Sequence, residues 1–370
     1  MKRKMPALLA LGVAVALASL LALAMLFAQG AGAAADEDLE QAAAPPGLGL
    51  AMDEAVREFS VPTANAFPLA IVTGPDGNLW FTEFNGNAIG RSTIDGVVTE
   101  FPIPTGSPGA ATSSQPDGIA VGPDGKLWFA EVRGNKIGRI TTLGVITEFL
   151  VPAPASAPTV IAAGPDGALW FTERRGNKIG RITTSGAVTE FELPNPDSRP
   201  LSITAGPDGN LWFTEERGNR VGRITPAGAI SEFPVTPGAR PWEIVTGPDG
   251  NLWFTEIAGN RIARMTLSGL LTEFCVPTGS PGIATSSLPN VIARGPGDFL
   301  VFSEQRGNKI GAITTDGRIV EFEVPTPASA PVGVTTGPAQ DVWFAESSAA
   351  NRIGRIVGFR GLVTAALASQ

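Results

Sequence analysis

The sequence predicts an all-β protein, a seven-bladed β-propeller with four-stranded antiparallel blades. Its composition is the first reason. The 370 residues include 45 glycines and 32 prolines, too many for a helical protein. Hydrophobic residues make up 43% of the chain, too many for a disordered protein. The second reason is a repeat. One segment recurs seven times, and its tryptophan, replaced once by Val301, lies 41 to 48 residues from the next.

Each repeat is expected to form four short strands joined by tight turns. In the first complete repeat these strands are residues 68–72, 79–83, 88–91 and 97–101. Glycine in the turns supplies the positive φ that most side chains disfavour. The three turns are Pro75-Asp76-Gly77, Gly86-Asn87 and Asp95-Gly96. The tryptophan of each second strand is expected to pack between neighbouring blades, because stacked sheets need a large apolar residue in each repeat.

Closure of the ring can also be predicted. A phenylalanine marks the fourth strand of each repeat, and the first of these, Phe59, precedes the first complete unit. We therefore expect residues 56–358 to form the propeller, with the N-terminal strand at residues 57–62 completing the last blade and removing its exposed edge. The segment Leu362-Val363-Thr364, within the C-terminal tail at residues 359–370, is the alternative closing strand.

The N-terminus has the pattern of an export signal. Three basic residues precede an apolar run from Pro6 to Ala28, and small residues follow as far as Ala35. Residues 1–35 are therefore predicted to be a signal peptide or an N-terminal membrane anchor, and residues 36–55 a flexible tether. We expect an extracytoplasmic protein, secreted or anchored, that meets the membrane only through this segment.

Composition also limits the chemistry. The chain has no histidine, no tyrosine and a single cysteine, Cys275, which excludes a Ser-His-Asp triad, a histidine base and a His/Cys zinc site. The net charge of −8 disfavours nucleic acid as a partner. Oxygen ligands remain, so the candidate cofactors are hard cations, Mg²⁺ or Ca²⁺. The expected partner is a small molecule, peptide or glycan on the channel face of a monomer.

Seven glutamates end the predicted second strands, at the face where each inner strand begins. They could form a ring of carboxylates and amides around the channel, suited to a cation. Alternatively, they serve each blade's folding, by capping strand ends or by pairing with the arginines of the third strands. The series is Glu83, Glu131, Glu173, Glu215, Glu256, Glu304 and Glu346, with arginines at Arg91, Arg139, Arg181, Arg223, Arg264 and Arg355.

Departures from the repeat are the better guide to function. The residue that follows the inner-strand proline differs from repeat to repeat. Among the residues at this position, Asp117 and Trp242 are the candidates for ligand binding. The sixth repeat has Val301 for tryptophan, Ser303 for threonine and Ala312 for arginine. Two similar longer loops, residues 104–117 and 277–290, are explained either by segmental duplication or by a binding role.

The repeat LWFTE-x-x-GN-x-IGRIT, with EF-x-(L/V)P after it and SAP or SRP before the inner strand, resembles the streptogramin B (virginiamycin B) lyases over about residues 57–357. The resemblance implies a seven-bladed fold and a Mg²⁺-dependent β-elimination that opens a cyclic depsipeptide antibiotic at its ester. It implies a histidine at position 290 and glutamates at positions 330 and 346 as metal ligands, and a histidine at position 332 as the general base. This chain has Asn290, Ala330, Glu346 and Val332 there, so only Glu346 keeps the implied residue type. A valine cannot accept a proton.

Three functional hypotheses follow from the sequence. The favoured one is an exported, lyase-like propeller that binds a ligand without the histidine-dependent elimination. The second is a Mg²⁺-dependent, streptogramin B lyase-like C–O lyase or a hydrolase with a rearranged oxygen-ligand site at Glu346, Glu304 and Asn290. The third is a lactonase-type enzyme in which Glu, Asn and Asp hold Ca²⁺ at the channel.

Overall fold

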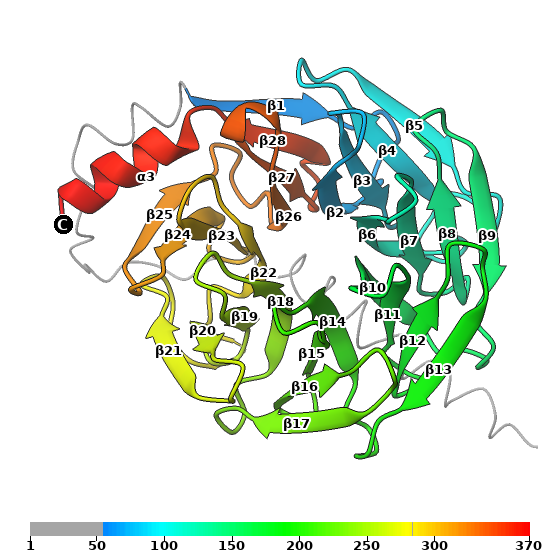
Figure 1. The fold of residues 1–370 in the computed structure, drawn as a ribbon. Coiled ribbons are helices and arrows are strands. Elements are labelled where there is room, and N and C mark those ends of the chain that lie inside the picture. The colour runs from blue at the N-terminus through cyan, green and yellow to red at the C-terminus, as the bar shows by residue number, and fades with distance from the viewer. Residues whose placement is uncertain (1–54, 283) are drawn as a thin grey trace, which may run out of the picture. The chain divides into compact units, whose positions relative to one another are not determined.

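The computed structural model describes residues 55–282 and 284–370, all within one compact unit, Pro46–Gln370. Its strands form seven four-stranded antiparallel sheets arranged as blades around a central axis (Figure 1). The prediction of an all-β, seven-bladed propeller is confirmed. The predicted signal or anchor, and the tether up to residue 54, lie outside the described residues. None of the described helices has the length and apolar character needed to cross a bilayer.

The blades are numbered in chain order, and each is given from its innermost strand outward. Blades 1 to 3 are β2 (Pro68–Thr73), β3 (Leu79–Glu83), β4 (Ala88–Ser92), β5 (Val98–Pro102); β6 (Pro116–Val121), β7 (Leu127–Glu131), β8 (Lys136–Ile140), β9 (Ile146–Leu150); and β10 (Pro158–Ala163), β11 (Leu169–Glu173), β12 (Lys178–Ile182), β13 (Val188–Glu192). Blades 4 to 6 are β14 (Pro200–Ala205), β15 (Leu211–Glu215), β16 (Arg220–Ile224), β17 (Ile230–Pro234); β18 (Pro241–Thr246), β19 (Leu252–Glu256), β20 (Arg261–Met265), β21 (Leu271–Cys275); and β22 (Pro289–Arg294), β23 (Phe299–Glu304), β24 (Lys309–Thr314), β25 (Ile319–Glu323). Blade 7 is β26 (Pro331–Thr336), β27 (Val342–Glu346), β28 (Arg352–Ile356) and β1 (Val56–Ser60), with a 3₁₀ turn at Pro338–Gln340.

The N-terminal strand closes the ring, as expected. β1 pairs antiparallel with β28, and Phe59 stacks on Trp343 of the same blade with ring centroids 5.9 Å apart. The alternative closing strand, residues 362–364, is instead part of an α-helix, α3 (Phe359–Ala368). Joining the two ends of the chain in one blade gives blade 7 the same four strands as the other six blades and closes the ring.

Six blades share one packing unit. The second-strand tryptophan, fully buried, stacks on the fourth-strand phenylalanine with centroids 5.3 to 5.9 Å apart. A third-strand arginine lies against each tryptophan, as Arg91 does with its Cζ 5.6 Å from the Trp80 ring. The prediction that the tryptophans pack the blades is therefore confirmed, and burial of these large rings stabilises each blade.

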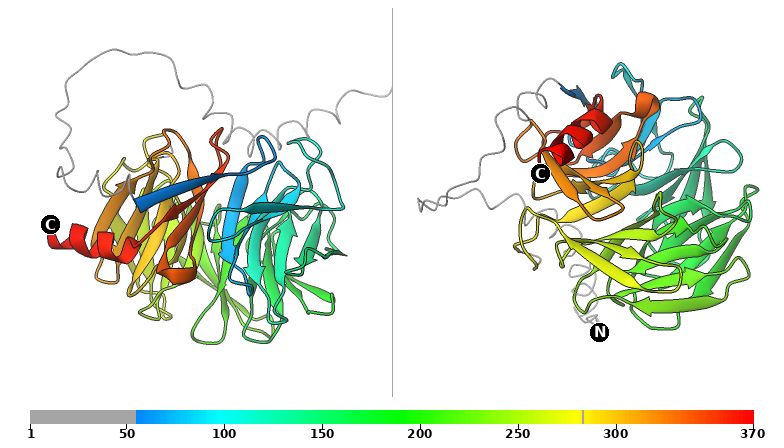
Figure 2. Two further views of the ribbon diagram at one scale, coloured as in Figure 1. Left: turned by 90° about the horizontal axis from the view of Figure 1, so that it is seen from above. Right: turned by 60° about the vertical axis from the view of Figure 1, so that its left-hand side comes forward.

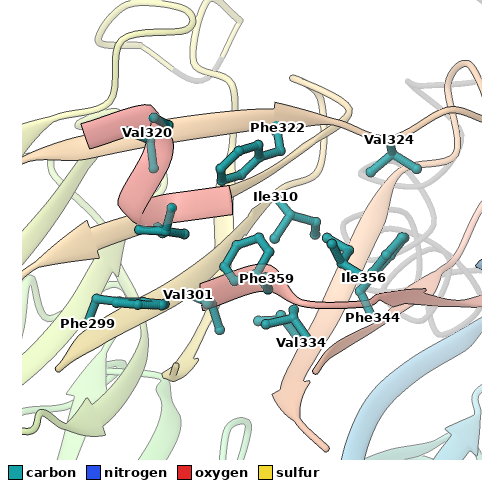
Figure 3. Close-up of a cluster of buried hydrophobic side chains, with 14 residues drawn as sticks. Phe299, Val301, Ile310, Val320, Phe322, Val324, Val334, Phe344, Ile356 and Phe359 are labelled. Atoms are coloured by element: carbon teal, nitrogen blue, oxygen red, sulfur yellow. The ribbon is translucent and has the colours of Figure 1, made fainter. Parts of the chain in front are cut away.

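Blade 6 lacks this unit and uses α3 in its place. With Val301 and Ala312 where other blades have tryptophan and arginine, Phe359 of α3 is fully buried beside Phe322, centroids 5.2 Å apart in an edge-on contact. Figure 3 shows the Phe359 ring between strands of blades 6 and 7, and Figure 2 shows α3 on the outer side of the ring. The helix thus fills the space that the smaller side chains leave.

Candidate functional site at the channel mouth

One face of the ring brings together the start of every inner strand and the end of every second strand. The first residue of each inner strand, a proline, pairs with the last residue of the second strand, a glutamate, as Pro116 does with Glu131. The register then shifts in all seven inner strands, so the two residues after the proline lie in a β-bulge. Bulges re-aim side chains, and four of the seven variable residues at this position are partly exposed: Leu69, Asp117, Trp242 and Asn290.

The seven repeated glutamates do not form a carboxylate ring open to this channel. Their side chains are fully buried, and both carboxyl oxygens of Glu83 and of its six equivalents have no hydrogen-bond partner among the described residues. A Cβ at Gly86 would clash with the Glu83 carboxyl, so the glycine of the next turn is needed to accommodate it. Burial, followed by the nearby Glu100 carboxylate, raises the pKa of Glu83 to about 8.

The repeated arginines and asparagines have structural partners of their own. The arginines lie on the tryptophans rather than on the glutamates, and several also reach the aspartate of the first turn, as Arg181 Nε does to Asp166 Oδ2 at 2.7 Å. An asparagine follows the glycine of the turn after each second strand or its equivalent, and all seven adopt a positive φ: Asn87, Asn135, Asn177, Asn219, Asn260, Asn308 and Asn351. Asn87, for example, donates to the carbonyl of Ile103 and accepts from the Ser114 amide at 2.7 Å. The suggested pairing of the glutamates with these arginines is therefore wrong.

The three candidate metal ligands lie in blades 6 and 7, with Asn290 on β22, Glu304 on β23 and Glu346 on β27. Glu304 and Glu346 are each buried beside the fourth-strand glutamate of their own blade, Glu321 and Glu58, and burial raises the pKa of Glu346 to about 8. The Asn290 amide donates to Gln305 Oε1 at 3.1 Å. Within residues 55–282 and 284–370, no group of three or more acidic, histidine or cysteine side chains could hold a metal ion.

Two of the four positions that the lyase resemblance assigns to chemistry, Ala330 and Val332, are apolar. Val332 is buried, with 4% of its surface exposed, and its backbone carbonyl accepts a hydrogen bond from Ser303 Oγ at 2.6 Å. Ala330 has no side-chain oxygen. One buried carboxylate and one amide do not match the Mg²⁺ site that the resemblance implies.

The other side of the mouth carries a charged cluster. Asp117, in the bulge of β6, and Glu243, in the bulge of β18, are partly exposed and close enough for their charges to interact across blades 2 and 5. Burial raises the pKa of Asp117 to about 7, against the lowering effect of Arg174. Burial, together with the charge of Asp117, raises the pKa of Glu243 to about 8, although a hydrogen bond from Ser202 opposes it. These carboxyl groups therefore titrate near neutrality.

Two arginines hold the cluster together. Arg174 donates to Glu216 Oε2 from Nε at 3.2 Å and from a terminal nitrogen at 2.5 Å, and Arg240 pairs with the other oxygen of this carboxylate. The Arg174 Cζ also lies 5.5 Å from the ring centroid of Trp242. Burial alone would raise the pKa of Glu216, but the two guanidinium groups hold it below its usual value. Glu216 is thus an ionised anchor for both arginines.

Buried hydroxyl groups fix the bulge that presents Trp242 and Glu243. Thr214 Oγ1, on β15, donates to the Trp242 carbonyl at 2.5 Å, while the Glu243 amide donates to Thr255 Oγ1 on β19 at 3.1 Å. Both threonines are fully buried. The same contact occurs in blade 6, where Ser303 replaces threonine. The bulge backbone is therefore rigid, which favours a preformed binding surface.

Two residues singled out from the sequence, Asp117 and Trp242, both lie in this cluster, joined through Arg174. Glu243, Arg174, Glu216 and Arg240 also belong to the cluster and were not predicted from the sequence. One signal was available for Glu243, because the third position of the seven inner strands carries an ionisable side chain only in blade 5. The two arginines and Glu216 lie in loops, and only the fold shows that they meet.

The seven four-stranded blades place this protein in the class of ring-shaped β-propeller proteins. Within this class, the chain belongs to the virginiamycin B lyase family, whose model matches residues 49–283 and, in an overlapping match, 196–366.

Three comparisons illustrate this membership. Virginiamycin B lyase from Staphylococcus aureus, in a selenomethionine-substituted crystal structure, is 40% identical over 81% of this chain and 98% of its own, with a TM-score of 0.74. A catalytically inactive histidine-to-alanine variant of the same lyase, solved with quinupristin, is 39% identical over the same shares, with a TM-score of 0.75. Virginiamycin B lyase from Bordetella parapertussis is 47% identical over 47 residues, which are 13% of this chain and only 16% of that relative's length.

Proposed function

We propose that this chain is an exported member of the virginiamycin B lyase family that binds a ligand at the channel mouth and does not carry out the family's histidine-dependent elimination. The observation that carries the proposal is Val332. A buried aliphatic side chain occupies the position that the resemblance assigns to the general base, in a chain without histidine. In the similar lyase from Staphylococcus aureus, the catalytically inactive variant differs by replacement of one histidine with alanine. The present sequence contains no histidine at all.

The ligand-binding half of the proposal is supported by the cluster around Asp117. Charged groups with shifted pKa values in a concave site are frequent at functional sites. Here two carboxyl groups, two guanidinium groups and a partly exposed indole meet at one mouth, on a backbone held by buried hydroxyls. A small molecule, peptide or glycan is the expected ligand, and export follows from the N-terminal pattern.

A product analysis tests the proposal. The full-length protein is incubated with quinupristin and Mg²⁺, and the recovered ligand is separated by liquid chromatography and mass spectrometry. Elimination opens the ring without changing the mass, so its product differs in retention time and fragmentation, whereas hydrolysis adds one water. We expect only the intact ligand. An opened product of either kind above the buffer control overturns the proposal.

One observation favours an enzymatic alternative with its base in another blade. The pKa of Asp117, raised by burial to about 7, suits a general base at neutral pH. If quinupristin is opened by the wild-type chain, the substitution Asp117→Asn decides between sites. Loss of opening in this variant assigns the base to Asp117, and retention of opening excludes it.

A further inference from the structure

We propose that the channel mouth between β6 and β18 binds an organic ammonium group, held between the carboxylates of Asp117 and Glu243 beside the indole of Trp242. The inference rests on the proposed function and names the chemistry of its ligand. The positions of three residues support it. Asp117 and Glu243 lie in the bulges of β6 and β18, which belong to non-adjacent blades, and Trp242 directly precedes Glu243 in the sequence.

The charge balance of the cluster leaves room for one positive charge. Glu216 is neutralised by the arginines that it binds, and one guanidinium charge remains to face Asp117 and Glu243. With every group ionised, the cluster therefore carries one net negative charge. At the corresponding bulge position, the other inner strands carry no ionisable side chain: these residues are Leu69, Thr159, Leu201, Asn290 and Val332.

The surroundings favour an ammonium group over a metal ion. Divalent cations prefer six or more oxygen ligands, and among the described residues no cluster of three acidic side chains offers them. Arg174 would also repel a double charge twice as strongly as a single one. An indole face beside carboxylates, by contrast, is a common receptor for organic cations, and the guanidinium of Arg174 already uses Trp242 in this way.

Protons and the ligand are expected to compete for the site. Because burial raises the pKa of Asp117 to about 7 and of Glu243 to about 8, the empty site is partly protonated at neutral pH. A cation needs both groups ionised, so its binding displaces protons and its affinity rises with pH. For a ligand whose charge does not titrate, we expect affinity to increase by about tenfold or more between about pH 6 and about pH 9.

Choline is the probe for the test, because its charge is permanent, and 3,3-dimethyl-1-butanol is its neutral isostere. Six of the seven tryptophans are fully buried, and Trp242 alone is partly exposed. Quenching of tryptophan fluorescence by acrylamide therefore reports on Trp242. We expect choline to protect Trp242 and to give a binding isotherm by calorimetry with the full-length protein, whereas the neutral isostere and CaCl₂ do neither.

Matched variants assign the effect to the two carboxylates. Asp117→Asn and Glu243→Gln are each expected to weaken choline binding by about tenfold or more, while Asp95→Asn, in an exposed turn of blade 1, leaves it unchanged. A cooperative thermal unfolding transition confirms that each variant is folded, and a variant that fails to fold is replaced by Asp117→Ser or Glu243→Ser.

The proposal is overturned if the neutral isostere or calcium binds as well as choline, if choline does not bind at any pH tested, or if binding persists unchanged in the folded variants. These outcomes differ from a failure of the proposed function. Absence of choline binding with intact quinupristin leaves the proposed function in place, whereas opening of quinupristin contradicts that function whatever choline does.

Discussion

The guanidinium of Arg174 lies over the indole of Trp242, with its Cζ 5.5 Å from the ring centroid, while its nitrogens bind Glu216. The three residues come from the loop after β11, from the loop after β15 and from β18, so this contact ties blades 3, 4 and 5 together at the channel mouth. The guanidinium group also covers part of the Trp242 ring, which is otherwise partly exposed.

Removal of the guanidinium is expected to uncover this indole. In the variant Arg174→Met, Trp242 loses the guanidinium group that lies over its ring. Glu216 also loses the two hydrogen bonds that Arg174 donates to it. Acrylamide quenching of tryptophan fluorescence should increase relative to the wild type, because Trp242 is the one tryptophan with exposed surface. Arg318→Met, in an exposed turn of blade 6, is the matched control and should leave quenching unchanged. Equal quenching in both variants would contradict the stacked arrangement in solution.

The C-terminal helix is predicted to contribute to stability through a single buried ring. Phe359→Ala removes a fully buried phenylalanine from the contact with Phe322, which should lower the free energy of unfolding by about 3 kcal/mol. Urea denaturation measures this loss. Thr364→Ala, on the exposed face of the same helix, should change it by less than about 0.5 kcal/mol. A loss of similar size in both variants would show that α3 does not dock through Phe359.

Ring closure by the N-terminal strand gives a second stability prediction. Phe59→Ala breaks the stack on Trp343 and should cost about 2 to 3 kcal/mol, although the residue lies at the far end of the chain from the rest of its blade. The exposed neighbour Arg57 provides the control, Arg57→Ala. If Phe59→Ala leaves the denaturation midpoint unchanged, β1 does not complete blade 7 in solution.

Stability is expected to fall as pH rises, because of the buried glutamates. Burial, then Glu100, raises the pKa of Glu83 from 4.5 to about 8, so the folded state holds more protons than the unfolded one between these values. The free energy of unfolding should therefore decrease from about pH 4.5 to about pH 8 as this group is forced to ionise.

Glu83→Gln tests this assignment, because an amide keeps the shape of the side chain without ionising. Blade 1 is the suitable place, since Ala88 stands where the other blades have a basic residue near the pair. Urea midpoints should match the wild type at about pH 5 and exceed it at about pH 9. Asp95→Asn in the same blade should differ from the wild type by the same amount at both pH values. If the midpoint of Glu83→Gln also differs from that of the wild type by the same amount at both pH values, the pKa of Glu83 is not raised.

The repeat made the fold predictable, because each blade carries the same turn, tryptophan and phenylalanine, and the extra phenylalanine at position 59 indicated the closing strand. The helix α3 was not predicted. Its signal was indirect, in the small residues Val301 and Ala312, whose missing volume is filled by a segment 47 residues further along the chain from Ala312.

The candidate site was predictable only in part. Asp117 and Trp242 stood out because the residue type at their position differs from repeat to repeat. The glutamates stood out because the same residue occurs in every repeat. The structure shows why repetition misled: a carboxyl group found in every blade is buried against a glycine turn of its own blade. Arg174 and Arg240 lie in separate loops, and no local pattern records that both reach Glu216.

The central claim is that the loss of the implied histidines removes the elimination while the fold is kept. It is tested most directly by the rate of quinupristin ring opening with Mg²⁺, measured by chromatography for the wild-type chain and for the triple variant Asn290→His, Ala330→Glu, Val332→His. We expect no ring opening by the wild-type chain above the rate of the buffer control, whereas the triple variant opens quinupristin. Mg²⁺-dependent ring opening by the wild-type chain would show that the elimination does not need these histidines.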